Sequence, residues 1–290
     1  MRRLLFALAL AGMVPLAARA QPAPAAGPAV DLRHRFQPGA VHTYRLVLEQ
    51  RLEVRTSLSP EEAQRFASRL AVDTRQTVRS AGSEGAVLEL AFGAPEATMS
   101  LQGVQMPVAG LDGLARLKLT MRMTDRGRLS EVEALDAPEL PPEVEGLAAE
   151  LKKNLTRNAV VFPDRPVAPG ESWTEERAVP AGLPGAEGLS MAVQATYTYR
   201  GMEKALGRSC ARVDSQVVLG IRGRLTQGGL PVEADLKGRG QGQACFSLEE
   251  GRLVRTRAGL SVDGTLQASQ GGQAVTTTLA LEANLSQELK

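Results

Sequence analysis

Aromatic residues, histidine and cysteine are scarce in this sequence, and their scarcity limits what the protein can be. Only 3% of the 290 residues are aromatic, and there are two histidines and two cysteines. Two cysteines are too few for a small scaffold held together by disulfides. The 29 glycines and 17 prolines follow no short period, which excludes a collagen-like chain. Because 43% of the residues are hydrophobic, we expect a folded chain with a buried core.

Catalytic and metal-binding patterns are also lacking. The histidines, His34 and His42, are too few to supply the ligands of a zinc site, and no H-E-x-x-H or C-x-x-C motif occurs. Gly170-Glu171-Ser172 resembles the start of a nucleophile elbow, but Thr174 stands where the final glycine belongs. We therefore predict a protein that is not an enzyme and that uses no metal or cofactor.

The first 20 residues have the three parts of a secretory signal peptide. Arg2 and Arg3 form a positive start, residues 4–18 are apolar, and Ala18-Arg19-Ala20 is a small-x-small cleavage sequence. The apolar stretch is short for a membrane span, so an uncleaved anchor is the less favoured alternative. We expect cleavage before Gln21, export to the periplasm or the extracellular space, and no transmembrane span in the mature chain.

Cleavage would change the charge balance. The whole chain has 34 lysines and arginines against 32 aspartates and glutamates, a net charge of +2. Loss of Arg2, Arg3 and Arg19 leaves 31 basic against 32 acidic residues, a net charge of −1. This near-neutral balance gives no reason to expect nucleic acid or an anionic membrane surface as a partner.

Alternation of apolar and polar residues dominates the chain after a Pro/Ala-rich leader at 21–30, which we expect to be disordered. Clean alternation predicts antiparallel strands with one buried face. We expect a mainly β protein of long, curved antiparallel sheets, half-barrel or sandwich-like, with β-rich halves at 31–140 and 169–290. Recurring Pro-Gly and Gly-Arg-Leu turns leave open whether the halves are a duplication. Clear apolar runs are Leu46, Leu48, Leu52 and Val54; Leu189, Met191, Val193, Ala195, Tyr197 and Tyr199; and Val213, Val217, Leu219 and Ile221.

Two segments show helical spacing instead. In the first, Ser59 and Glu62 can form a capping box around Pro60. The second begins at Pro141, in a helix and linker segment at 141–168. We expect both helices to pack their apolar faces on a sheet. The apolar positions are Ala63, Phe66, Ala67 and Leu70 in the first helix, and Val144, Leu147, Ala148, Leu151 and Leu155 in the second.

The two cysteines lie on the polar faces of predicted strands. Cys210 shares its face with Arg212, and Cys245 lies opposite the apolar positions Ala244 and Phe246. Cysteines on polar faces are poorly explained as core residues, and an exported protein meets an oxidising environment. We therefore predict a Cys210–Cys245 disulfide, with two free thiols as the alternative.

The segment from Phe162 to Trp173, FPDRPVAPGESW, resembles the F-P-x-x-P-V-x-x-G-x-x-W pattern of uncharacterised exported bacterial β-rich proteins. The resemblance covers mainly residues 160–255 and implies export and a β fold, with no established activity. Long strands with a covering helix are also similar, at the level of fold, to periplasmic lipoprotein-carrier half-barrels. Within the motif, we expect Trp173 to anchor a strand in the core, with stacking on a ligand as the alternative.

These observations favour a non-catalytic periplasmic or secreted binding module for a lipid or another hydrophobic ligand, held on an apolar sheet face partly covered by helices. The alternative is a structural or interaction protein of the bacterial envelope, which binds another envelope protein and whose apolar faces are ordinary core. The candidate ligand contacts are Phe66, Leu70, Leu147, Leu151 and Trp173.

Overall fold

The computed structural model describes residues 27–106, 108, 111–135, 160–180, 188–227, 230–270 and 273–290. The expected signal peptide at 1–20 lies outside these ranges. The strands are β1 (Val41–Thr56), β2 (Ser59–Gly82), β3 (Gly85–Phe92), β4 (Glu96–Leu101), β5 (Val104–Met106), β6 (Lys118–Met123), β7 (Leu129–Leu135), β8 (Ser172–Pro180), β9 (Gly188–Ala205), β10 (Arg208–Gln227), β11 (Leu230–Ser247), β12 (Arg252–Gln270) and β13 (Gln273–Leu289).

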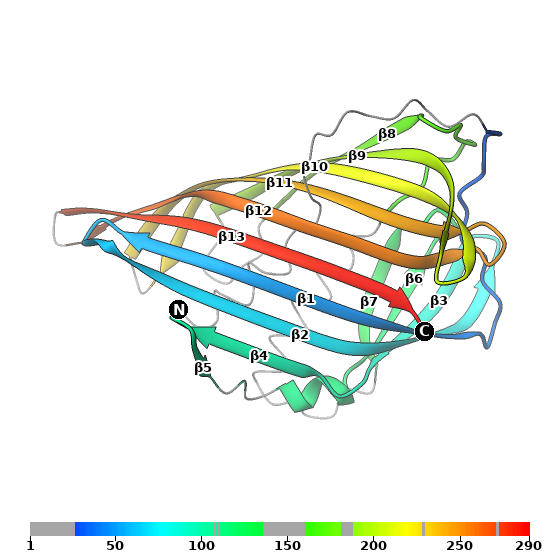
Figure 1. Ribbon diagram of the computed structural model, residues 1–290, viewed down its shortest axis with the longest axis horizontal. Coiled ribbons are helices and arrows are strands. Elements are labelled where there is room, and N and C mark those ends of the chain that lie inside the picture. Colours follow the sequence, from blue (N-terminus) through cyan, green and yellow to red (C-terminus); the bar gives the residue numbers. More distant parts are fainter. Residues whose placement is uncertain are drawn as a thin grey trace.

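All of these strands belong to one antiparallel sheet of 13 strands (Figure 1). Its main path runs β7-β6-β3-β2-β1-β13-β12-β11-β10-β9-β8, while β4 pairs with β2 and β5 pairs with β4. β1 and β13 join the two groups of strands, with Tyr44 opposite Leu289 at one end and Thr56 opposite Thr277 at the other. The sequence-based expectation of a mainly β protein with long antiparallel strands therefore agrees with the structure.

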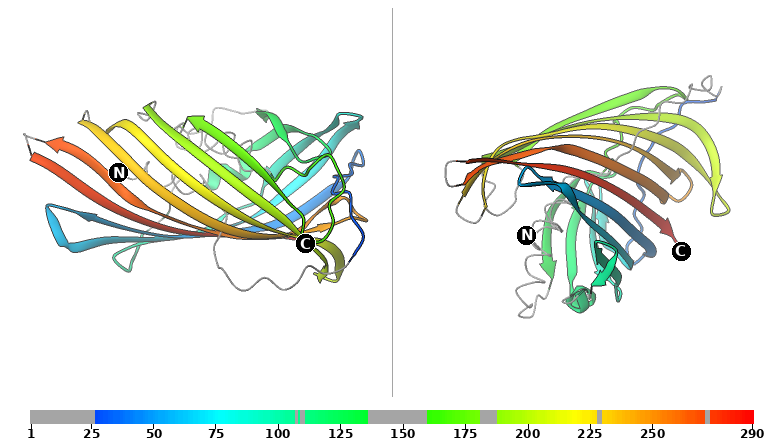
Figure 2. Two further views of the ribbon diagram at one scale, coloured as in Figure 1. Left: turned by 90° about the horizontal axis from the view of Figure 1, so that it is seen from above. Right: turned by 60° about the vertical axis from the view of Figure 1, so that its left-hand side comes forward.

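The sheet is open and strongly curved. β7 and β8 stand at the two ends of the strand order. Figure 2 shows the long strands as an arch, with β3 to β7 bent beneath it. We call the side of the sheet to which the buried alternate side chains of β9 to β13 point the inner face, and the opposite side the outer face.

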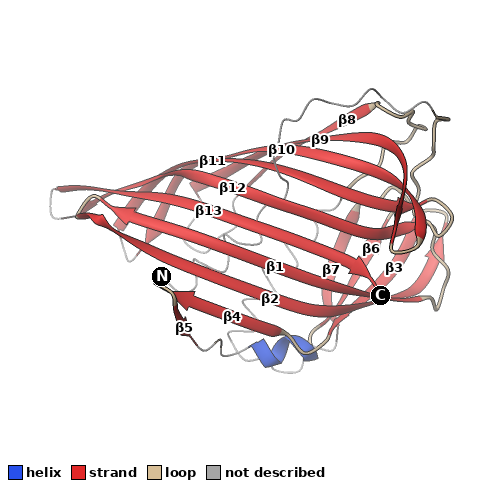
Figure 3. Ribbon diagram, viewed as in Figure 1, coloured by secondary structure: helices blue, strands red, loops and turns tan. Residues whose placement is uncertain are grey.

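The expectation of two packing helices is wrong. The described residues contain no α-helix, and the short 3-10 helix η1 (Leu111–Arg116) is their one helical element (Figure 3). The segment expected to form the first helix, from Ser59, is instead the start of β2. The second expected helix, at 141–155, lies outside the described residues. Among these residues, no helix has the length and apolar character needed to cross a membrane.

Cross-strand pairing explains why the segment after Ser59 is a strand. It pairs with β1 at Ser59 and again from Gln64 onward, with a register shift between Val54 and Thr56 near the hairpin turn. Arg65 and Arg69 form ion pairs with Glu53 and Glu49 of β1, at 3.0 and 3.4 Å. Helical spacing is a weak local preference, and the hydrogen bonds and side-chain pairs of a long β ladder override it.

Two clusters of buried apolar side chains lie where other segments cross the sheet. In the first, Leu32, Phe162 and Val167 pack on Tyr197 and Phe246 of β9 and β11. In the second, Leu114 of η1 and the adjacent Leu117 pack with residues of β2, β3 and β6, which are Val72, Val78, Ala86, Leu88, Leu119 and Met121. These two clusters fix the crossing segments to the sheet.

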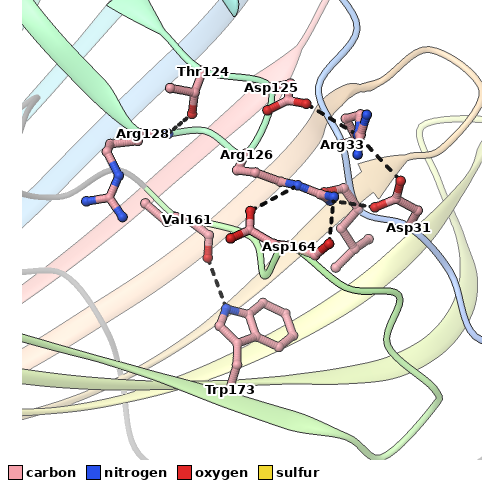
Figure 4. A network of polar contacts seen from close by, with 10 residues as sticks. Asp31, Arg33, Thr124, Asp125, Arg126, Arg128, Val161, Asp164 and Trp173 are labelled. Carbon is pink, nitrogen blue, oxygen red and sulfur yellow. Dashed lines mark hydrogen bonds and ion pairs between the residues drawn. The ribbon is translucent and has the colours of Figure 1, made fainter. Parts of the chain in front are cut away.

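Arg126 ties the crossing segments together (Figure 4). Its side chain is 10% exposed, and its guanidinium donates hydrogen bonds to the Asp31 carboxylate at 2.5 Å, the Leu32 carbonyl at 3.0 Å and the Asp164 carbonyl at 3.1 Å. Arg33 adds an ion pair to Asp31 at 3.4 Å. A guanidinium suits this junction because its donors are fixed in a plane and can serve several acceptors at once.

The predicted Cys210–Cys245 disulfide is confirmed. Its Cα atoms are 5.4 Å apart on the neighbouring strands β10 and β11. Both cysteines are fully buried, in a small cluster with Ala205 and Val254. The expectation of a disulfide on a polar surface was therefore right about the bond and wrong about its exposure.

Candidate ligand-binding face

The largest cluster of buried apolar side chains lies on the inner face of β9 to β13. These strands alternate, so every second side chain points to this side. The exposed fraction of the members ranges from 2% for Val262 to 9% for Leu225. We call this cluster the inner apolar face. Its members are Leu189, Met191, Leu219, Ile221, Leu225, Val232, Ala234, Leu236, Leu260, Val262, Leu279 and Leu281, with Leu52, Val193, Leu266 and Ala268 at its margin.

The inner apolar face differs from the other two main clusters in where its side chains come from. Each of those clusters is completed by residues from segments between the strands, such as Phe162 or Leu114. The inner apolar face takes all of its members, within the described part of the chain, from strands of the sheet. Its members are at most 9% exposed, so they form one continuous buried apolar surface across β9 to β13.

The outer face of the same strands is charged. Arg222 and Asp235 form an ion pair across β10 and β11 at 3.1 Å, and Arg224 and Glu233 do so at 2.6 Å. All four side chains are more than half exposed. Exposed pairs of this kind add little to the free energy of unfolding, but they keep the outer face in water. The buried apolar side chains of this part of the sheet thus lie on its inner side.

At the β8 end of the sheet, polar groups appear on the inner side. Trp173 lies opposite Tyr197 of β9, and their rings stack with centroids 5.5 Å apart. Two and four residues further along β8, Glu175 and Arg177 form an ion pair at 2.5 Å, with 17% and 26% of their side chains exposed. Burial, followed by the nearby Glu175 carboxylate, raises the pKa of Tyr197 to about 12, while Arg177 opposes this shift. Tyr197 is therefore neutral at physiological pH.

The structure brings some of the predicted ligand contacts to this face. Phe66 and Leu70 lie on β2 directly opposite Leu52 and Leu48 of β1, so they share the face of Leu52 at the margin of the inner apolar face. Trp173 belongs to the neighbouring cluster and donates its indole N–H to the Val161 carbonyl at 3.0 Å. Leu147 and Leu151 lie outside the described residues. Contact of any of these side chains with a ligand stays a prediction.

The sequence-based list of ligand contacts missed the residues that form most of the inner apolar face. The sequence places Leu189, Met191, Leu219 and Ile221 at alternating strand positions, but its pattern does not group them as a site. The signal was present in the long apolar runs of β9 and β10. The sequence does not reveal that the five strands β9 to β13 place these runs side by side.

The two histidines, which are candidate reactive groups, pack or pair with neighbouring side chains. His34 is buried, stacks on Phe36 and Phe162, and meets Phe246 edge-on. This burial lowers its pKa to about 4, although a hydrogen bond with the Gly251 backbone opposes the shift.

His42 contacts Arg252. Its pKa is lowered by burial and then by the Arg252 charge, against the effect of Glu250. One group in the described residues, Glu203 with Cys210 and Cys245, has the spacing of a metal site. The two sulfurs are bonded to each other, so they cannot act as thiolate ligands.

Comparisons with known proteins identify no family for this chain. No family model matches the sequence, and no curated protein matches it significantly. The resemblance carried by residues 162–173 therefore stays a prediction.

Two solved structures are similar to this chain. A structure of lipid–protein interactions in lipovitellin matches with a TM-score of 0.50 and 13% identity, over 88% of this chain and 25% of that one. This chain thus spans a quarter of the length of the lipovitellin chain, and the match shows a likeness of fold alone. An outer membrane channel from Pseudomonas putida F1 matches over 94% of this chain and all of that one, at 10% identity and a TM-score of 0.24, which is too low to support an argument.

Proposed function

We propose that this protein is a non-catalytic binding module that holds the hydrocarbon part of a lipid on the inner apolar face. One observation carries the proposal. Twelve buried apolar side chains from five adjacent strands, β9 to β13, form one cluster, the largest among the described residues. A lipid tail can pack on such a surface, because the transfer of its hydrocarbon from water to apolar side chains is favourable.

The likeness to lipovitellin supports the proposal at the level of fold. The lipovitellin structure concerns lipid–protein interactions. A shared fold does not carry a shared ligand, because unrelated functions occur on one fold. The likeness therefore adds to the argument from the inner apolar face and does not replace it.

We also infer that the protein is exported. Disulfides form and persist mainly in oxidising compartments, so the Cys210–Cys245 bond favours an exported protein. The arginine-led apolar start of the sequence is the expected signal for export. N-terminal sequencing of protein from the periplasm or medium should give a chain that starts at Gln21. A chain that keeps Arg2 and Arg3 would contradict this inference.

The binding test uses N-phenyl-1-naphthylamine, an apolar dye whose fluorescence rises when it leaves water. We expect saturable binding to the wild-type protein. Ala234→Trp should weaken binding at least about tenfold, because the indole fills space on the inner apolar face. Val218→Trp is the matched control, since Val218 lies on the outer face of neighbouring β10 and is 57% exposed. It should leave binding unchanged.

Ala234→Leu provides a smaller obstruction if the tryptophan variant fails to fold, and circular dichroism checks both variants. Absence of saturable dye binding, or equal loss in the inner and outer variants, would overturn the proposal. The protein would then be the structural or interaction protein that the sequence left as the alternative.

A further inference from the structure

We propose that the turn between β9 and β10 docks on a membrane, where Leu206 and Met202 enter the apolar edge of the lipid surface and Lys204 binds the phosphates of anionic lipids. This inference goes beyond the proposed function and does not depend on it, because it uses none of the residues of the inner apolar face. It starts from a leucine in a backbone conformation that leucine rarely adopts.

Leu206 and Gly207 form the whole turn of this hairpin, since Ala205 and Arg208 are already paired across it. Both turn residues have positive φ angles, 49° for Leu206 and 76° for Gly207. This is the geometry of a type I′ turn, whose first central position favours Asn, Asp or Gly. Leucine is unfavourable there, because its Cβ crowds the following carbonyl oxygen. The needs of the fold therefore do not explain a leucine at this position.

Two large apolar side chains of this hairpin are open to water. Leu206 is 45% exposed, and Met202, four residues earlier, is 52% exposed. The base of the turn is fixed, because Ala205 is buried beside the Cys210–Cys245 disulfide. Figure 2 shows the end of the hairpin bending away from the neighbouring strands. Exposed apolar side chains that gather at one place commonly mark a site of interaction.

The end of the hairpin carries one unpaired positive charge. Glu203 forms an ion pair with Arg255 at 3.2 Å, and Arg208 forms one with Glu250 at 2.9 Å, so both of these charges are neutralised. Lys204 is exposed and has no ion pair with the described part of the chain. The near-neutral net charge of the whole chain does not reflect this local excess.

Apolar side chains beside an unpaired cation suit a lipid surface. Leu206 and Met202 gain free energy by moving from water to the apolar edge of a bilayer. Lys204 lies on the same side of β9 as Met202, and its ammonium can reach the phosphates of an anionic surface. A protein partner fits less well, because a stable protein interface buries about 800 Å² on each side, far more than a two-residue turn offers. Docking through so few groups is weak and reversible.

The test is flotation of the protein with two kinds of lipid vesicle, phosphatidylcholine alone and phosphatidylcholine mixed equally with phosphatidylglycerol. We expect about fivefold tighter binding to the anionic vesicles, the effect of about one basic residue at such a surface. Lys204→Gln should remove this preference. Leu206→Asn should weaken binding to the anionic vesicles about tenfold, since it removes a half-exposed leucine from the contact. It should also keep or raise the midpoint of thermal unfolding, because asparagine suits the first position of a type I′ turn.

Two matched controls lie away from this turn. Leu58→Asn replaces a leucine that is 65% exposed at the turn between β1 and β2, where the acidic Glu61 and Glu62 are also exposed. Lys237→Gln replaces an exposed lysine on the outer face of β11. Both variants should bind vesicles as the wild type does.

Four outcomes would overturn this inference. They are no binding of the wild type to either vesicle, an anionic preference that survives Lys204→Gln, equal losses in Leu206→Asn and Leu58→Asn, and a lower unfolding midpoint for Leu206→Asn, which would make Leu206 a residue that the fold needs. In each case the proposed function would still stand, because dye binding on the inner apolar face is measured without vesicles.

Discussion

The guanidinium of Arg126 donates a hydrogen bond to the carboxylate of Asp31, a residue 95 positions earlier in the chain. The same side chain serves the carbonyls of Leu32 and Asp164, so one residue joins three segments that are distant in sequence. The segments next to this junction supply Leu32 and Phe162 to the core. The junction therefore holds Leu32 and Phe162 against the apolar side chains of the sheet.

Replacement of Arg126 should be costly. Arg126→Ala leaves the Leu32 and Asp164 carbonyls without this donor and leaves the Asp31 carboxylate with Arg33 alone. Loss of these hydrogen bonds from a largely buried guanidinium should cost about 2–3 kcal/mol of unfolding free energy. Urea unfolding measures the loss. Arg122→Ala is the control, because Arg122 and Glu131 are 46% and 64% exposed and such a pair contributes less than about 1 kcal/mol. Similar losses in the two variants would contradict a special role for Arg126.

The buried His34 should make the protein sensitive to acid. Its folded pKa of about 4 lies below the ordinary value of 6.5, so the unfolded chain binds its proton first. Stability is therefore fully present above pH 6.5 and is lost as the pH falls toward 4, by about 3 kcal/mol. Urea unfolding at several pH values between 7.5 and 4 should show this slope. His34→Phe keeps an aromatic ring among Phe36, Phe162 and Phe246 and should flatten most of the slope. His42→Asn should flatten it less, because His42 is less buried than His34.

Loss of the disulfide should destabilise the protein. The Cys210–Cys245 bond closes a loop of 35 residues, for which chain entropy gives about 3–4 kcal/mol. The double variant Cys210→Ala/Cys245→Ala should unfold at correspondingly lower urea concentration. Reductant should shift the wild type in the same direction and leave the double variant unchanged. An unchanged wild-type midpoint in reductant, with reduction verified by mass spectrometry, would be inconsistent with this prediction.

Two glycines of β10 should respond in opposite ways to alanine. Gly223 has φ +131°, and a side chain there would overlap the carbonyl oxygen of Gly188, so Gly223→Ala should cost more than about 1 kcal/mol. Nothing lies within 4 Å of a Cβ at Gly220, so Gly220→Ala should be neutral or slightly stabilising. Thermal unfolding of the two variants distinguishes them. A loss at Gly220 equal to that at Gly223 would refute the geometric explanation.

The sequence predicted the strands well because their buried faces repeat with a period of two. It failed at β2 because Phe66 and Leu70 are four residues apart, a spacing that suits one face of a helix and one face of a strand equally. The ion pairs of Arg65 with Glu53 and of Arg69 with Glu49 join this segment to β1 and favour the strand over the helix. That signal involves two strands, so it becomes visible only when their pairing is known.

The candidate site was less predictable than the fold for the same reason. The local pattern indicates which side of each strand is apolar, but the inner apolar face depends on the order of the strands. The Cys210–Cys245 pairing was predictable because only two cysteines are present. Their burial was not, since it depends on Ala205 and Val254 from other strands.

The pairing of β1 with β13 has a consequence for how the chain reaches its final structure. Among the described residues β1 is the first strand and its partner β13 is the last, so Tyr44 pairs with a residue 245 positions later in the chain. Contacts this distant in sequence slow folding, to about milliseconds to seconds in small all-β proteins. Until then one edge of β1 carries unpaired backbone groups that can join another chain. The protein is therefore most prone to aggregate while β13 is not yet paired with β1.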